Sequence, residues 1–424
     1  MSEDLPNPGR AAQRRVATLG DLFGQSLWMG LIGFGGGMSV LGAIRYLAVE
    51  KRRWLTEREF ANTATVAQML PGGAAANALA HIGLRGRGLT GAVVAYTGFV
   101  VPGAAITLFL AWLYVRYGVA PRAALVLDGL NAGVVGIIGA LALQMVRTAV
   151  GRAWQMAVAT GALLLSVAGG AASGEIALLG VASGLVIDLV VKRARLARVR
   201  RRPGKRSPPV ALPDEGQPLE RLDATRPPSP PGRDPPVLPA AVPLLAFKVG
   251  AGGLLALALL FFRTGLGAYG GGFAIIPHLH ASVVEGGWIT ERQFADAVAV
   301  GKLTPGPVLL MATFIGYVAR GFPGALLATF TIFMAPFLLV VVLGTWLLRM
   351  RSRRAVRAAL RGLTPAVVGL MAEAAVTVGA TLRAPVDFGI AAATALTLSR
   401  FRVNPVIVLL LAGAVRWGLS AAGV

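Results

Sequence analysis

Long apolar segments separated by short polar stretches dominate the chain. Most have roughly the ~20 residues that a membrane-spanning helix needs, except where glycine or proline interrupts them. A polar gap separates the first six segments from the last seven. The pattern predicts an all-α polytopic membrane protein. The segments run over 21–49, 60–83, 89–115, 123–149, 153–170, 174–191, 240–262, 263–284, 294–318, 322–348, 356–381, 384–400 and 404–421.

The polar gap at 192–239 is predicted to be a linker. It opens with nine basic residues and no acidic one between Lys192 and Arg206, and 13 of the 26 prolines fall between Pro203 and Pro243. Such a segment cannot bury enough apolar surface to fold, so we expect it to be disordered. Short basic stretches beside a membrane stay in the cytoplasm. We therefore place both this linker and the basic N-terminal tail in the cytoplasm.

Motifs before the linker recur after it at a nearly constant spacing, which indicates a tandem duplication. The stretch 54–61, Trp-Leu-Thr-Glu-Arg-Glu-Phe-Ala, returns at 288–295, and six such pairs have offsets of 233 to 235 residues. Thr56 and Thr290 are the predicted N-caps of the helices that follow. The other pairs are Phe34–Gly37 with Tyr269–Gly272, Leu70–Gly72 with Thr304–Gly306, Ile82-Gly83 with Ile315-Gly316, Gly91-Ala92 with Gly324-Ala325, and Gly129–Gly136 with Gly362–Gly369.

The two halves differ in a way that predicts opposite orientations in the membrane. The apolar segment at 240–262 comes before the second repeat, and one extra crossing would invert everything after it. The loop before Trp54 is Glu-Lys-Arg-Arg, whereas its counterpart before Trp288 is Glu-Gly-Gly. We therefore expect inverted-topology repeats, as in many secondary transporters. The expected division is a tail at 1–19, a first transmembrane repeat at 20–191, the linker at 192–239, and an extra helix plus second repeat at 240–424.

Glycine and proline interrupt the apolar segments at four matched places, which we call the four breaks. They are Gly35–Gly37, Pro71-Gly72, Gly270–Gly272 and Pro305-Gly306. The arms on either side are too short to span, so each interrupted segment is either a re-entrant hairpin or a broken spanning helix. Unpaired backbone amides in lipid cost several kcal/mol, so breaks persist only inside protein or beside water. The free N–H groups of a restarting helix attract anions; the alternative role of these glycines is close helix packing.

Polar residues beside the breaks suggest an anionic substrate. Lys302 lies three residues before Pro305, and its repeat partner Gln68 lies three before Pro71. A lysine within an apolar segment is a candidate functional residue, the alternative being a side chain that reaches the membrane interface. The candidate binding residues are Gly35, Gly36, Gly37, Gln68, Pro71, Gly72, Asn77, Gly270, Gly271, Gly272, Lys302, Thr304, Pro305 and Gly306.

A second group of polar residues offers candidates for ion coupling. Asp128 and Arg361 occupy equivalent repeat positions and are expected either to form a salt bridge across the repeat axis or to lie at a membrane surface. Glu373 sits deep in its segment and is a candidate proton carrier. Asp296, which pairs with Asn62, is expected at the membrane interface. His81 is expected to be buried and hydrogen-bonded, with a proton relay as the alternative.

Composition narrows the classes of function. Hydrophobic residues make up 55% of the 424 residues and charged residues 14%, against about 25% charged in soluble domains. The net charge of +22 is therefore a record of topology rather than a sign of nucleic-acid binding. With no cysteine and three histidines, we expect no metal centre and no catalytic site. Nucleotide-binding motifs are also missing, so we predict no cofactor and no ATP-driven pump.

The chain resembles the chromate ion transporter family. The resemblance rests on Phe34-Gly-Gly, Arg52-Arg-Trp-Leu55, Gln68-Met-Leu-Pro-Gly72, Gly270-Gly-Gly272, Gly287-Trp-Ile289 and Pro305-Gly-Pro307, and it covers about 20–190 and 245–420. It implies chromate export, coupled in some members to the proton-motive force, by two inverted halves fused in one bacterial inner-membrane protein. The chain departs from the family at 73–77, where Gly-Ala-Ala-Ala-Asn replaces Pro-Ala-Ser-Ser-Gln, and at Lys302, where a glutamine is usual.

The sequence thus predicts a secondary transporter of a small oxyanion between the four breaks, with chromate as the first candidate. Sulfate transport, a passive anion channel and a membrane-embedded enzyme are the alternatives. The expected partners are the oxyanion and the lipid bilayer, with a homodimer as a candidate assembly and no nucleic acid.

Overall fold

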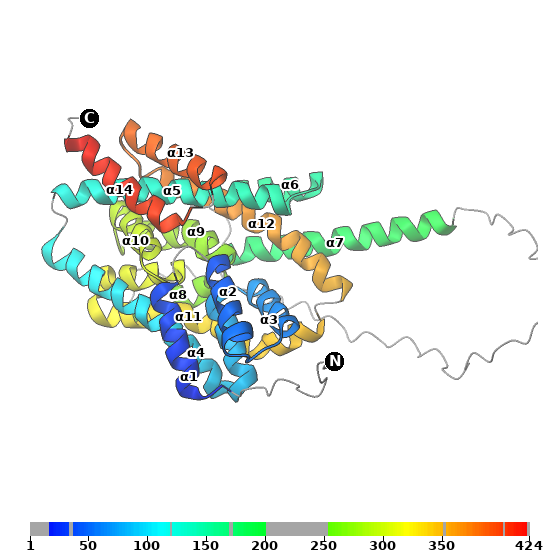
Figure 1. The fold of residues 1–424 in the computed structure, drawn as a ribbon. Helices are drawn as coiled ribbons and strands as arrows, with labels where there is room; N and C mark the ends of the chain where they lie inside the picture. The colour runs from blue at the N-terminus through cyan, green and yellow to red at the C-terminus, as the bar shows by residue number, and fades with distance from the viewer. Residues whose placement is uncertain are drawn as a thin grey trace, which may run out of the picture. The chain divides into compact units, whose positions relative to one another are not determined.

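The computed structural model of the chain describes residues 17–33, 37–118, 121–168, 173–200, 253–350, 353–401 and 403–421. Each regular element within these ranges is helical (Figure 1). The first half contains α1 (Leu19–Ile32), α2 (Gly37–Arg45), η1 (Tyr46–Lys51), α3 (Glu57–Met69), α4 (Ala74–Tyr117), α5 (Pro121–Ala149), α6 (Ala153–Val167) and α7 (Ser173–Arg200). The second contains α8 (Leu254–Leu266), η2 (Gly270–Ile275), α9 (Ile276–His280), η3 (Ala281–Glu285), α10 (Glu291–Leu303), η4 (Val308–Leu310), α11 (Met311–Met350), α12 (Arg354–Gly379), α13 (Pro385–Arg400) and α14 (Pro405–Ala421).

The prediction of an all-α polytopic membrane protein is confirmed. Five helices within the described residues are long and apolar enough to cross a membrane. Large apolar side chains such as Leu255 and Leu396 are about 70% exposed, which suits a surface that faces lipid. The five segments are Ala74–Tyr117, Ala123–Thr148, Ser173–Arg193, Val308–Leu347 and Arg354–Gly379.

The duplication is visible helix by helix. α8 precedes the glycine triplet of the second half just as α1 precedes that of the first, so α8 is the counterpart of α1. The segment at 240–262 was expected to be an extra helix, but its described part belongs to α8 and is not an addition to the repeat; residues 240–252 lie outside the described part of the chain. α4 and α11 also share a kink, in which Gly88 and Gly321 both adopt φ +64°.

The repeated Trp-x-Thr-Glu-Arg motif caps a helix in both halves, as predicted. The hydroxyl of Thr56 accepts from the Glu59 amide, and the Glu59 carboxylate accepts from the Thr56 amide. Thr290 and Gln293 form the same reciprocal pair at the start of α10. These capping boxes fix where α3 and α10 begin, and therefore where each reaches its Pro-Gly break.

Helices of each half pack against helices of the other half. α5 of the first half packs against α13 and α14 of the second, and α12 of the second packs against α6 of the first (Figure 1). Close glycine contacts join α7 to α12, because a Cβ at Gly362 would overlap the carbonyl of Gly180. The equivalent helices α4 and α11 also contact each other, as do α5 and α12. The halves are thus interlocked through small residues, as is common between membrane helices.

The chain forms one compact unit of residues 1–188 with 249–424 and a second unit of 189–248. The contacts between the two halves described above join residues up to 188 with residues from 249 onward, and so belong to the first unit. α7 continues to Arg200, into the predicted linker, since Lys, Arg, Ala and Leu favour helix. The predicted cytoplasmic tail is described only from residue 17, and the linker beyond Arg200 lies outside the described residues.

Candidate functional site

Each Pro-Gly break is hydrogen-bonded to a residue that precedes the glycine triplet of the other half. The amide of Gly72 donates to the carbonyl of Ala268 at 2.7 Å, just before the second glycine triplet. The amide of Gly306 donates to the carbonyl of Gly33 at 3.3 Å, just before the first triplet. The two bonds are related by the repeat offset, so the structure joins each Pro-Gly break to the triplet end of the other half.

The backbone at the described breaks strongly favours glycine. Gly72 and Gly306 have φ of +100° and +115°, and Gly270, Gly271 and Gly272 have φ of +63°, +74° and +96°. These positive values are strained for residues with a side chain. A Cβ at Gly72 would also lie 2.6 Å from Pro336 of the other half. Gly35 and Gly36 lie outside the described residues, and Gly37 begins α2.

Lys302 is the cation of this region. It lies in the last turn of α10, is 7% exposed, and has its ammonium 5.2 Å from the ring centre of Phe273. Phe273 directly follows the glycine triplet of the same half. Within the described part of the chain, Lys302 has no carboxylate within salt-bridge distance. A buried ammonium without a counter-charge is costly, so this position favours an anion.

The start of α4 supplies backbone donors. After the Pro71-Gly72 break the helix restarts at Ala74, with Gly73 as its N-cap. Helix geometry leaves the amides of its first turn without intrahelical acceptors. The side-chain amide nitrogen of Asn77 donates to the carbonyls of Pro71 at 2.9 Å and Ala67 at 3.2 Å. Asn77, predicted as a substrate donor, therefore uses its donors to hold the break.

Thr304 and Gln68 are placed differently from what their repeat positions suggested. The buried hydroxyl of Thr304 lies 3.2 Å from the Thr107 hydroxyl of α4, so it links the halves at the second break. Gln68 is exposed, and its amide donates to the carbonyl of Ala64 on its own helix. Gln68 and Lys302 thus occupy equivalent positions in the repeat but different environments in the fold.

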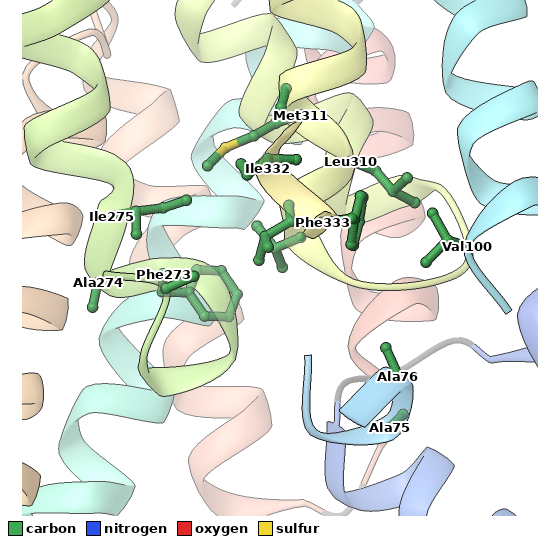
Figure 2. Close-up of a cluster of buried hydrophobic side chains, with 14 of the residues drawn as sticks. Ala75, Ala76, Val100, Phe273, Ala274, Ile275, Leu310, Met311, Ile332 and Phe333 are labelled. Carbon is green, nitrogen blue, oxygen red and sulfur yellow. The ribbon is translucent and has the colours of Figure 1, made fainter. Parts of the chain in front are cut away.

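Apolar side chains of both halves surround the breaks. Figure 2 shows some of the buried side chains, among them Ala75 and Ala76 at the start of α4 and Phe273 and Leu310 of the second half. All belong to one buried cluster. Such surroundings exclude water and strengthen the interaction of Lys302 with an anion.

The expected salt bridge between Asp128 and Arg361 is wrong. Asp128 instead pairs with Arg292 of α10 at 3.1 Å, and the Arg361 guanidinium donates to the carbonyl of Arg357. Repeat equivalence does not make two residues neighbours unless both lie close to the repeat axis. Glu373 is 7% exposed, as its deep position predicted, and accepts a hydrogen bond from Thr377 on its own helix.

Two further expectations meet different outcomes. Asp296, expected at the membrane interface, has no exposed area and bonds to Tyr114 and Asn131 of the first half. α5 and α4 of the other half cover this face of α10, so the Asp296 side chain is enclosed by protein. His81 is buried and lies 3.2 Å from the Thr63 hydroxyl, as expected for a hydrogen-bonded core histidine.

Comparison with known proteins gives a consistent set of relatives. The sequence profile described as "Chromate transporter" matches residues 20–187 and 255–417. A "Probable chromate transport protein" of Synechococcus elongatus is 30% identical, over 83% of this chain and 82% of its own. Chromate transport proteins of Cupriavidus metallidurans and Pseudomonas aeruginosa are 29% and 28% identical, over 85% and 93% of this chain and 82% and 91% of theirs. No solved structure matches the chain.

Proposed function

The chain belongs to the chromate transporter family, and we propose that it carries chromate across a bacterial inner membrane as a secondary transporter. The names of its relatives support chromate as the cargo. The long apolar helices support a multi-pass protein. Export is the direction that the family resemblance implies.

One observation carries the assignment of the binding site: Lys302 is buried beside two breaks that are hydrogen-bonded across the halves. Chromate is a divalent tetrahedral oxyanion. The Lys302 ammonium supplies a positive charge and three donors, and the restarting helix α4 supplies backbone amides. The anion in turn supplies the counter-charge that the described surroundings of Lys302 lack. The site therefore suits a small, desolvated oxyanion.

The way in which the breaks are joined supports alternating access. The bonds from Gly72 to Ala268 and from Gly306 to Gly33 both cross between halves. Rocking one half against the other would change both bonds together, and with them the route from the site to each side of the membrane. The different charges of 50–53 and 285–287 support opposite orientations of the halves, with the first of these loops in the cytoplasm.

Sulfate is the competing substrate, because it shares the charge and shape of chromate. Ala75 and Ala76 stand where the family usually has serines, so hydroxyl donors are replaced here by apolar side chains. Lys302 compensates with a fixed charge, which any divalent oxyanion can use. Discrimination between the two anions then depends on the size of the site rather than on hydroxyl contacts.

The test is flux of labelled chromate and of labelled sulfate in proteoliposomes, with and without a pH gradient and an uncoupler. We expect saturable chromate exchange that excess unlabelled sulfate inhibits weakly. Flux of neither anion would contradict the proposal. Flux that follows only the anion gradient, without exchange, would identify a channel.

A further inference from the structure

α10 carries a carboxylate that the site described above does not use. Asp296 has no exposed area, although it lies on the helix that ends at the Pro305-Gly306 break. Its Oδ2 accepts from the Tyr114 hydroxyl at 2.9 Å, and its Oδ1 accepts from the Asn131 amide at 3.1 Å. Both donors belong to the first half. A buried carboxylate therefore sits at the contact between the halves.

The cation nearest to this carboxylate is shared with a second acid. The Arg292 guanidinium lies 3.9 Å from Asp296 but 3.1 Å from Asp128, which is partly exposed. Two carboxylates thus face one guanidinium. The buried one, Asp296, is stabilised in its charged form mainly by two neutral hydrogen-bond donors. A buried charge with so little compensation exchanges readily with the neutral, protonated form. Arg292 and Asp128 are 45% and 33% exposed, so the charged groups beside Asp296 extend to the surface of the protein.

The hydrogen bonds around Asp296 can be arranged for either protonation state. With Asp296 charged, Tyr114 and Asn131 both donate to it, and Oδ1 of Asn131 is buried without a partner. With Asp296 protonated, its new O–H needs an acceptor, and half a turn of the Asn131 amide presents Oδ1. The vacant acceptor of one arrangement is the acceptor that the other requires.

We propose that Asp296 binds and releases the proton that is coupled to oxyanion movement, a role that rests on the proposed transport function. One proton moves from water to an Asp296 oxygen as one side opens, and returns to water on the other side. No covalent bond other than O–H forms or breaks.

The position of Asp296 explains how its protonation can affect the Pro305-Gly306 break. Tyr114 and Thr107 lie seven residues apart on one face of α4, and they contact Asp296 and Thr304 respectively. α4 of the first half therefore contacts α10 both at the Asp296 carboxylate and at Thr304, beside the break. Loss of the charge at Asp296 weakens one end of this contact and favours its rearrangement at the other.

The other groups around α10 do not replace Asp296 in this role. From α14, Arg416 is paired with Asp387 at 2.8 Å and acts electrostatically on Asp128. From α11, Phe314 packs edge-on against the Tyr114 ring. Glu373 is buried too, and its hydrogen-bond partners Thr377 and Ser166 lie on α12 and α6. Asp296 is bonded across the halves on the helix that ends at the Pro305-Gly306 break, so its protonation can bias the relative position of the halves at that break.

Infrared spectroscopy tests the proposal without any substrate. Acidifying the full-length protein is expected to produce the C=O stretch of a buried carboxylic acid, lost in Asp296→Asn. The band should persist in Asp188→Asn, the matched control, whose carboxylate pairs with Arg354 across the halves. Tyr114→Phe removes a donor to the charged form, so it should shift the midpoint to higher pH. A band unchanged in D296N, or lost instead in Glu373→Gln, would overturn the proposal.

Transport by the same variant separates this inference from the proposed function. We expect D296N to retain chromate exchange between equal pools, which needs no net proton movement, and to lose the response to an imposed pH gradient. A D296N protein that still follows the gradient would also overturn the inference. If the parent protein exchanges no chromate, the proposed function fails, and the infrared band still decides whether Asp296 takes up a proton.

Discussion

The ammonium of Lys302 lies 5.2 Å from the centre of the Phe273 ring, which joins the last turn of α10 to the residue after the second glycine triplet. Two breaks of one half are thus linked through a single cation. Cation–π contacts in desolvated surroundings are worth about 2 kcal/mol, less than a fully charged partner provides. An oxyanion bound to Lys302 would therefore interact with the ammonium more strongly than Phe273 does.

Replacing Lys302 with alanine should reduce chromate exchange strongly. Hydrogen bonds to charged groups contribute about 1.5–3 kcal/mol, which corresponds to a loss of about ten- to hundredfold. Exchange in proteoliposomes measures this loss. Trp288→Phe, a change in the loop before α10, should stay close to the parent. Equal exchange by the two variants would contradict the assignment of the site.

Gly306→Ala should abolish exchange while the protein remains folded. At φ +115° alanine is strained by about 1–3 kcal/mol, and its Cβ would lie 3.0 Å from Leu310. Relief of this strain would displace the amide that bonds to Gly33. Gly139→Ala on α5 meets nothing within 4 Å and should behave as the parent. If G306A exchanges chromate at the parent rate, the break does not need its present geometry.

The orientation of the halves can be measured with single cysteines, because the chain contains none. Lys51→Cys and Glu285→Cys mark equivalent exposed positions of the two repeats, at the ends of η1 and η3. In inverted repeats, a membrane-impermeant thiol reagent should label the first from the cytoplasmic side and the second from the opposite side. Labelling of both from one side would establish parallel repeats and remove the proposed inversion.

The packing of α12 of the second half against α7 of the first should depend on small residues. Gly362→Val places a branched side chain against the Gly180 carbonyl and the backbone of Gly184. Overpacking of this kind costs about 1–3 kcal/mol, so thermal unfolding in detergent should begin at a lower temperature. Gly161→Val on α6 meets nothing within 4 Å and serves as the control. Equal unfolding temperatures would show that the contact between α7 and α12 adjusts at little cost.

Features that depend on neighbouring residues in the chain were predicted correctly from the sequence. Thr56 and Thr290 cap their helices because a cap depends on residues within one turn, and those residues are neighbours in the chain. The breaks at Pro71-Gly72, Gly270–Gly272 and Pro305-Gly306 interrupt their helices because backbone conformation is a property of each residue. The expectation for His81 succeeded for a similar reason, since burial follows from the apolar segment around it.

Contacts between the halves were not predictable from repeat positions. The pairing of Asp128 with Arg361 was wrong because a repeat match says which residues are equivalent, not which ones meet. Asp296 and Asn62 are equivalent, yet only Asp296 is fully covered by the other half. The same applies to exposed Gln68 and buried Lys302.

By itself, the sequence determined that this is a duplicated helical membrane protein with four breaks and one lysine beside them. These features follow from hydrophobicity, from backbone conformation and from periodicity, all of which act over short stretches of chain. The tertiary structure decided that Gly72 meets Ala268, that Gly306 meets Gly33, and that Asp296 faces Tyr114. Those contacts join residues more than 180 positions apart. They depend on how two large apolar surfaces fit together, which no local pattern specifies.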